Sequence, residues 1–288
     1  MRDEQEILAL ITDFCARSDL IRAAILTGSR ADPRHAVDWL SDYDVELYVS
    51  GMRPFLSDDD WLKSFGSVML RWPRRPQTTF SPDWLTRLVV FTDRTRIDFQ
   101  ITGLKKPRPE HYDNGYRVLI DKDGIATGLP APTYTGYNVT PPTETEYLDT
   151  VNSFWWDALY VPKALWRNEL PFARYMLEVQ LRFTFLHRVL GWKIGGDGGW
   201  PVNPGREGKY LQKYLDGDTW KQYEATCAAA DATSAWTAFF TLVDLFSRLA
   251  RETGDRLEFH YPENTEREAR AFCRIIREET VKKGSTSQ

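Results

Sequence analysis

The sequence contains few cysteines, and they lie far apart. Its 288 residues include only Cys15, Cys227 and Cys273, with no Cys-x-x-Cys pair. This spacing argues against a zinc cluster or a redox pair. Widely separated free thiols are typical of a reducing compartment, so we expect a cytoplasmic protein.

Long apolar runs and long basic runs are also missing. No segment approaches the roughly 18 consecutive apolar residues of a membrane helix, and the N-terminal MRDEQEILALI lacks the apolar core of a signal peptide. The net charge is −4, and Lys and Arg form no long run. Because phosphate backbones require clustered positive charge, we expect neither a membrane nor a nucleic acid as partner. The sequence does not set the oligomeric state, and a monomer is compatible with it.

The first part of the chain mixes helical and strand patterns. Apolar residues recur at helical spacing over 4–18, whereas 21–28 and 42–50 are short apolar runs that end at turn residues. A short helix is expected over 57–66, with its first residue as the N-cap. Residues 86–102 predict a hairpin of two β-rich runs joined by Thr-Asp-Arg-Thr. These patterns predict a mixed sheet covered by helices.

The composition changes in the middle of the chain. Residues 128–147 are rich in Pro, Thr and Gly and have little apolar periodicity, which is typical of a linker or a long crossing loop. We therefore expect two domains, residues 1–145 and residues 146–288. The fold class is predicted to be α+β, with an N-terminal mixed sheet and flanking helices followed by a C-terminal helical domain.

Helical spacing dominates beyond the linker. One apolar helical face is expected between residues 174 and 192, formed by Met176, Val179, Phe183, Leu186 and Leu190. A further helix over 263–279 is expected to begin with a capping box of Thr265 and Glu268. Pro162 lies within a helical run and predicts a break or a kink there.

Two aspartates lie one residue apart in the second predicted strand. Asp42 and Asp44 would point to the same face because side chains alternate along a strand. Carboxylates that close repel each other unless a cation lies between them, and Mg²⁺ prefers such oxygen ligands. Asp98, in the second strand of the hairpin, would add a third carboxylate, and three can hold the two metal ions that suit in-line attack at phosphorus. The alternative is that Asp42 is a turn residue and Asp98 an exposed strand residue.

A Gly-Ser pair precedes these carboxylates at the end of the first strand. Gly28 and Ser29 would let backbone N–H groups and a hydroxyl approach a phosphate, as in anion-binding nests. By itself, Gly-Ser is a very common turn. The pair gains its significance from its combination with Asp-x-Asp.

These motifs resemble a known superfamily. GSR (28–30), DYDVELYV (42–49) and RIDF (96–99) are similar to the signature of the nucleotidyltransferases typified by polymerase beta. Together with FWWDALYVPKALWRNEL (154–170) and GREGKYLQKYL (205–215), they resemble the aminoglycoside 6-adenylyltransferases, which modify streptomycin.

The resemblance implies a reaction and a set of residues. AMP would move from ATP to a hydroxyl of streptomycin, with release of pyrophosphate, and position six is implied by the resemblance alone. The partners would be ATP, two Mg²⁺ ions and a cationic aminoglycoside. Asp42, Asp44 and Asp98 would bind metal and catalyse, and the residues against the triphosphate would be Gly28, Ser29 and Arg30. The alternatives are another hydroxyl acceptor, such as a different aminoglycoside or a lincosamide, and a non-catalytic nucleotide-binding protein.

The helical half offers candidates for the remaining roles. Asp98 or Glu178 would accept the hydroxyl proton, although Arg174, Glu178 and Arg182 also fit a solvated ion-pair ladder. Lys209 would contact the β- or γ-phosphate, or it is an ordinary exposed lysine. Its surroundings do not match a P-loop.

The acceptor requires negative charge and aromatic faces, because aminoglycosides are cationic. Trp155, Asp157 and Glu169 are the candidates in the family-like segment. A Phe-Trp-Trp run also fits a helical core. We expect ATP and the acceptor to meet in a cleft between the two domains.

Overall fold

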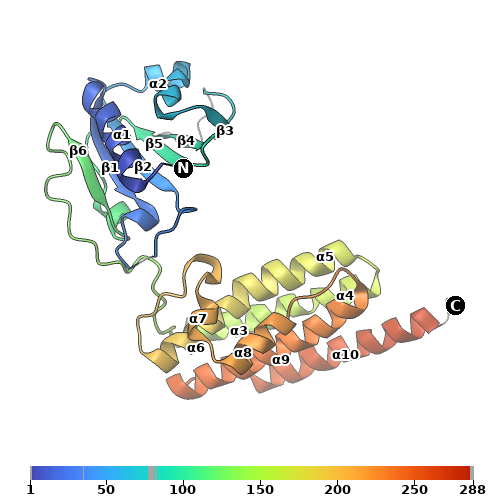
Figure 1. Cartoon of the computed structure of the whole chain (residues 1–288). Coiled ribbons are helices and arrows are strands. Elements are labelled where there is room, and N and C mark those ends of the chain that lie inside the picture. Colours follow the sequence, from blue (N-terminus) through green and yellow to red (C-terminus); the bar gives the residue numbers. More distant parts are fainter. Residues whose placement is uncertain (1, 35, 77–80, 82, 286–288) are drawn as a thin grey trace. The chain divides into compact units, whose positions relative to one another are not determined.

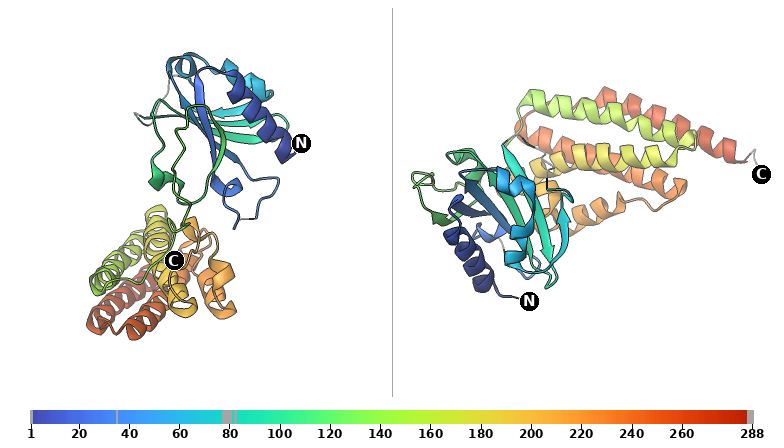
Figure 2. Two further views of the ribbon diagram at one scale, coloured as in Figure 1. Left: turned by 90° about the vertical axis from the view of Figure 1, so that its left-hand side faces the viewer. Right: turned by 90° about the horizontal axis from the view of Figure 1, so that it is seen from above.

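The computed structural model describes residues 2–34, 36–76, 81 and 83–285. The chain divides into two compact units, Met1–Gly136 and Tyr137–Gln288. The first is built on a sheet and the second on helices (Figures 1 and 2). Among the described residues, none of the helices is both long enough and apolar enough to span a bilayer. The structure therefore has the α+β class that the sequence predicts.

The first unit contains a six-stranded mixed sheet with the order β3-β4-β5-β2-β1-β6 (Figure 1). The strands are β1 (Ile21–Thr27), β2 (Tyr43–Val49), β3 (Val68–Trp72), β4 (Trp84–Phe91), β5 (Arg96–Thr102) and β6 (Arg117–Asp121). β2 and β5 are parallel, and the other neighbouring pairs are antiparallel. The two central strands therefore begin at the same end of the sheet.

One face of this sheet is packed with apolar side chains. It is covered by α1 (Glu4–Arg17), α2 (Arg53–Ser57) and the 3₁₀ turn η2 (Asp60–Phe65). Along β2, Tyr43, Val45 and Leu47 are buried in this core. Because side chains alternate along a strand, Asp44 and Glu46 point to the opposite face.

The predicted strands and the hairpin are confirmed, and the helix over 57–66 is wrong. Ser57 ends α2, and residues 60–65 form a 3₁₀ turn. Two edge strands, β3 and β6, were not predicted. Neither strand has the buried and exposed alternation on which a strand prediction depends, since no residue of either is fully buried.

The second unit is a helical bundle. Its long helices are α3 (Glu144–Ala158), η4 (Met176–Leu186), α6 (His187–Gly198), α9 (Ala232–Leu257) and α10 (Glu263–Ser285). The shorter ones are α4 (Tyr160–Trp166), α5 (Leu170–Tyr175), η5 (Arg206–Gly208), α7 (Leu211–Tyr214) and α8 (Gly217–Ala225). In the core, the rings of Phe154 and Phe246 stack with their centroids 3.5 Å apart. This joins α3 to α9.

The segment η4 is a π-helix, which changes the predicted apolar face. The N–H of His187 bonds to the carbonyl of Arg182, five residues earlier. With this wider turn, Val179 and Phe183 are 42% and 43% exposed, and Leu181 is fully buried. The predicted face over 174–192 assumed the spacing of an α-helix and is wrong at these two positions.

Two helix ends also bear on the predictions. α3 ends at Ala158 and α4 begins at Tyr160, with Leu159 between them at helical φ and ψ angles, so the helix is interrupted three residues before the buried Pro162, as predicted. The capping box of Thr265 and Glu268 is wrong, because α10 begins earlier, at Glu263. A capping box does occur at the start of α3, where Thr143 and Glu146 exchange hydrogen bonds.

Candidate active site

Gly28 lies directly against the carboxylate of Asp44. Thr27, the last residue of β1, pairs with Asp44 on β2. Gly28 follows with a φ of +69°, and a Cβ built there would lie 2.0 Å from Oδ2 of Asp44. Both the backbone angle and the close contact require glycine. The end of β1 therefore helps to fix the position of the Asp44 side chain.

The three aspartates come together at one end of the sheet. Asp44 and Asp98 are register partners on the parallel strands β2 and β5, so their side chains point to the same face about 5 Å apart at the backbone. Asp42 is the residue immediately before β2. Its carboxylate interacts electrostatically with that of Asp98. The structure thus brings the predicted trio together on the sheet face opposite the helices.

The local electrostatics favour a bound cation. Burial, and then the negative charges of Asp98 and Asp42, raise the pKa of Asp44 to about 6. Burial also raises the pKa of Asp42, against the lowering effect of Arg96. Each ionised carboxylate here raises the free energy of its neighbours unless positive charge is placed between them.

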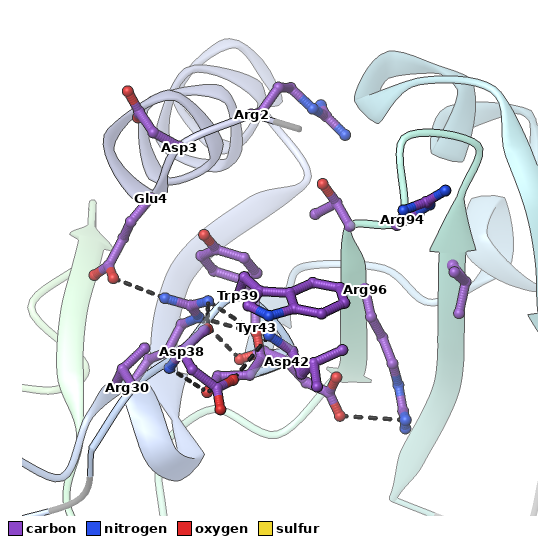
Figure 3. Close-up of a pocket in the computed structure, with 15 residues that line it drawn as sticks. Arg2, Asp3, Glu4, Arg30, Asp38, Trp39, Asp42, Tyr43, Arg94 and Arg96 are labelled. Carbon is purple, nitrogen blue, oxygen red and sulfur yellow. Dashed lines mark hydrogen bonds and ion pairs between the residues drawn. The ribbon is translucent and has the colours of Figure 1, made fainter.

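Arg96 supplies positive charge at this position. Its Nε and Nη2 donate to the two oxygens of Asp98 at 2.9 and 2.7 Å. Its Nη1 lies 3.2 Å from Oδ2 of Asp42. A dashed line in Figure 3 marks this ion pair. Sequence analysis missed this residue, although its position two residues before Asp98, on the same face of β5, is a signal that was available.

The chemistry of the donor set fits Mg²⁺, because carboxylate oxygens are its preferred protein ligands. The arrangement itself is not that of a preformed metal site. Among the described residues, no three His, Cys, Asp or Glu side chains are placed to hold a metal ion. The guanidinium of Arg96 provides the positive charge between Asp42 and Asp98 instead.

Arg30 positions the loop that carries Asp42. Its guanidinium pairs with Glu4 at 2.7 Å and donates to the carbonyls of Ser41, at 2.9 Å, and Asp42, at 3.2 Å. It also lies over the ring of Tyr43, 4.0 Å from the ring centroid (Figure 3). Arg30 was predicted to contact the nucleotide, and here its donors are engaged within the protein. Ser29 is half-buried in the same turn.

A pocket of about 520 Å³ opens beside Asp42 (Figure 3). Its walls include the half-exposed Arg96 and the exposed ring of Trp39. Further positive charge comes from Arg2, Arg30 and Arg94, the last of which lies in the turn of the hairpin. The pocket is therefore next to the carboxylates and combines charged groups with an aromatic surface.

A fourth carboxylate, that of Glu46, lies on the same face of β2. It accepts a hydrogen bond from the hydroxyl of Tyr112, which in turn lies 2.7 Å from the hydroxyl of Tyr48. Burial raises the pKa of Glu46. Sequence analysis missed it, although the alternation Asp42, Asp44, Glu46 is visible in the sequence.

In the helical unit, Glu178 belongs to an ion-pair ladder. It pairs with Arg174 and lies 3.8 Å from Arg182. Arg174 also donates to the carbonyl of Ala228 at 3.1 Å, and Arg182 donates to that of Thr226 at 2.8 Å. The ladder that the sequence allowed as an alternative is therefore present, but it is not solvated throughout, because Arg182 is buried. It ties η4 to the loop after α8.

The other predicted residues of this unit have different surroundings. Lys209 is exposed, with Nζ 5.6 Å from the ring centroid of Tyr210. Trp155 is 1% exposed, and its Nε1 donates to the hydroxyl of Tyr261 at 3.0 Å, so its ring is part of the core. Asp157 is half-buried, and burial raises its pKa. Glu169 is exposed just before α5.

A mixed sheet that carries Gly-Ser beside one aspartate on each of two parallel strands, with a third aspartate just before one of them, is characteristic of a nucleotidyltransferase. The model of the family described as streptomycin adenylyltransferase matches residues 1–276 of the chain. The chain belongs to this family.

Its curated relatives span nearly the full length of the chain. The aminoglycoside 6-adenylyltransferase of Bacillus subtilis is 28% identical over 92% of this chain and 95% of its own length. The protein of the same name from Campylobacter jejuni is 29% identical over 91% of this chain and 92% of its own. A crystal structure of an aminoglycoside 6-adenyltransferase from B. subtilis aligns over 94% of this chain and 98% of that one, with 24% identity and a TM-score of 0.45.

Proposed function

We propose that this protein transfers AMP from ATP to a hydroxyl of streptomycin in a Mg²⁺-dependent reaction in the cytoplasm, and so confers aminoglycoside resistance. The observation that carries the proposal is the pairing of Asp44 with Asp98 across two parallel strands, next to Gly28. Membership of the streptomycin adenylyltransferase family supports the reaction type. The names of the relatives support an aminoglycoside as acceptor.

The N-terminal unit is assigned the nucleotide. Asp42, Asp44 and Asp98 would hold Mg²⁺, which would neutralise charge on the phosphates and on the leaving pyrophosphate. Gly28 and Ser29 would direct N–H groups and a hydroxyl to the triphosphate. In this assignment Arg30 acts by holding Asp42 rather than by binding phosphate, because its donors are already used.

We assign the binding of the acceptor to carboxylates, because the guanidinium and amine groups of streptomycin are positively charged. Glu46 is the first of these, since it lies two residues beyond Asp44 on the same sheet face and accepts a hydrogen bond from the hydroxyl of Tyr112 rather than from a cationic side chain. Asp157 and Glu169 of the helical unit remain candidates, as do Asp98 and Glu178 for accepting the hydroxyl proton. Lys209, which is exposed, would contact the β- or γ-phosphate.

Mass spectrometry tests the proposal. With ATP and Mg²⁺, the protein should add one AMP to streptomycin, and Asp44→Asn should lower the rate by at least about a hundredfold, as expected for loss of a group that acts in the transition state. A panel of other aminoglycosides and a lincosamide tests the acceptor. Addition of AMP to a different member of the panel would replace streptomycin in the proposal, and absence of transfer to every member would refute it.

A further inference from the structure

The guanidinium of Arg96 bridges two of the three aspartates. It uses Nε and Nη2 on both oxygens of Asp98, and Nη1 on one oxygen of Asp42. The side chain of Asp98 is 11% exposed and that of Arg96 is 42% exposed, so the arginine lies on the solvent side of the carboxylate. A bidentate pair of this kind is among the stronger hydrogen-bonded ion pairs in proteins.

The same oxygen atoms are those that a divalent ion would need. Each carboxylate oxygen has a limited number of acceptor positions, and Arg96 already occupies positions on three of them. A guanidinium and Mg²⁺ placed together at these atoms would also repel each other. Moreover, among the described residues no three acidic side chains are arranged to hold a metal. Binding of Mg²⁺ therefore requires the arginine to move.

The structure gives this arginine room to move. It lines the pocket of about 520 Å³ beside Asp42. By contrast, Arg87 and its partner Asp59 are both fully buried and are fixed in the core of the same unit. The side chain of Arg96 is 42% exposed, so it can turn into solvent when a metal ion takes its partners.

We propose that Arg96 is an internal counter-ion, which holds Asp42 and Asp98 together in the metal-free protein and releases both carboxylates when Mg²⁺ binds. This role rests on the proposed function, because it assumes that the aspartates bind metal. Arg96 is thus a positioning residue. It keeps the mutually repelling carboxylates in place for the ion that replaces it.

The test uses Arg96→Gln with Mg²⁺ alone, without nucleotide. Without its counter-ion the metal-free variant should melt about 2–4 °C lower than the wild type in EDTA. Without its competitor, it should bind Mg²⁺ about three- to tenfold more tightly by titration calorimetry. Saturating Mg²⁺ should therefore raise its Tm more than that of the wild type. Arg96→Lys, which keeps the charge but not the bidentate contact, should give a smaller change of the same sign, and it serves as the test if Arg96→Gln fails to fold.

Arg108→Gln is the matched control. Arg108 is about as exposed as Arg96 and pairs with Asp83 in the same unit, at 3.0 Å, and its loss should leave Mg²⁺ affinity unchanged. An affinity of the Arg96 variants equal to or weaker than that of the wild type would overturn the inference. If the wild type still transfers AMP, such a result removes only the role of Arg96. If the wild type neither binds Mg²⁺ nor transfers AMP, the proposed function fails as well.

Discussion

At the scale of single residues, Gly28 is the position with the least tolerance for change. Gly28→Ala would place a Cβ 2.0 Å from Oδ2 of Asp44 and adopt a φ of +69°, which costs about 1–2 kcal/mol for an L-residue before the contact is counted. We expect at least a tenfold loss of AMP transfer, because Asp44 would be displaced, and a lower Tm.

The matched control is Gly51→Ala, just after β2. A Cβ there has no neighbour within 4 Å, so both activity and Tm should stay near the wild-type values. Gly28→Ala with wild-type turnover would mean that the contact with Asp44 is not needed.

Asp44 should lower stability while it supports activity. Its folded pKa is raised from 3.8 to about 6, so its ionised form disfavours folding. The contribution of the protonated Asp44 carboxyl to the stability of the folded protein is fully present below pH 3.8. It is lost as the pH rises through about 6. Asp44→Asn should therefore be about 1–2 kcal/mol more stable than the wild type in EDTA at pH 8.

This stability difference should shrink toward zero near pH 4, and denaturant unfolding at the two pH values measures it. A variant that is less stable than the wild type at pH 8 would contradict the account of the carboxylate cluster.

The site could be predicted in part from the sequence. The alternation of side chains placed Asp42 and Asp44 together, and the hairpin supplied Asp98, whose strand β5 lies beside β2 in the sheet. The same alternation puts Arg96 on the face of Asp98 but does not show its contact with Asp42, because a guanidinium can point to solvent or to a carboxylate, and only the register of β5 against β2 decides which.

At the scale of elements, the π-helix sets the buried face of η4. Leu181 is fully buried, and Val179 is 42% exposed. Leu181→Ala should therefore cost about 2–5 kcal/mol, and Val179→Ala less than about 1 kcal/mol. Chemical denaturation of the two variants compares these costs. Equal costs would indicate the α-helical register that the sequence predicted.

Elements were predictable where their apolar pattern had a regular period. The alternating strands of the hairpin satisfied this condition, as did α1. The edge strands β3 and β6 did not, because they have no fully buried residue. The spacing of a π-helix is not visible in the sequence either, since the i+5 hydrogen bonds are a result of how the helix packs.

At the scale of the whole molecule, each unit has its own core. The apolar cluster under the sheet is drawn from residues 7–120, and that of the bundle from residues 139–276. A unit with its own core can fold alone. Residues 1–136 and 137–288, expressed separately, should each unfold cooperatively by circular dichroism. A fragment 1–136 without cooperative unfolding would contradict the independence of the sheet unit.

The composition change after residue 125 was enough to predict a helical second half, since amphipathic periodicity is a local property. The boundary was harder to predict, because the linker has no pattern of its own and the start of α3, capped by Thr143, lies within the Pro- and Thr-rich stretch.

The central claim is that the aspartates on β2 and β5 carry out AMP transfer. The most direct measurement is the transfer rate of Asp98→Asn beside that of Asp93→Asn, which changes an aspartate in the turn of the same hairpin, paired with Arg2. We predict a loss of at least about a hundredfold for Asp98→Asn and less than about threefold for Asp93→Asn. Wild-type turnover in Asp98→Asn would contradict the account.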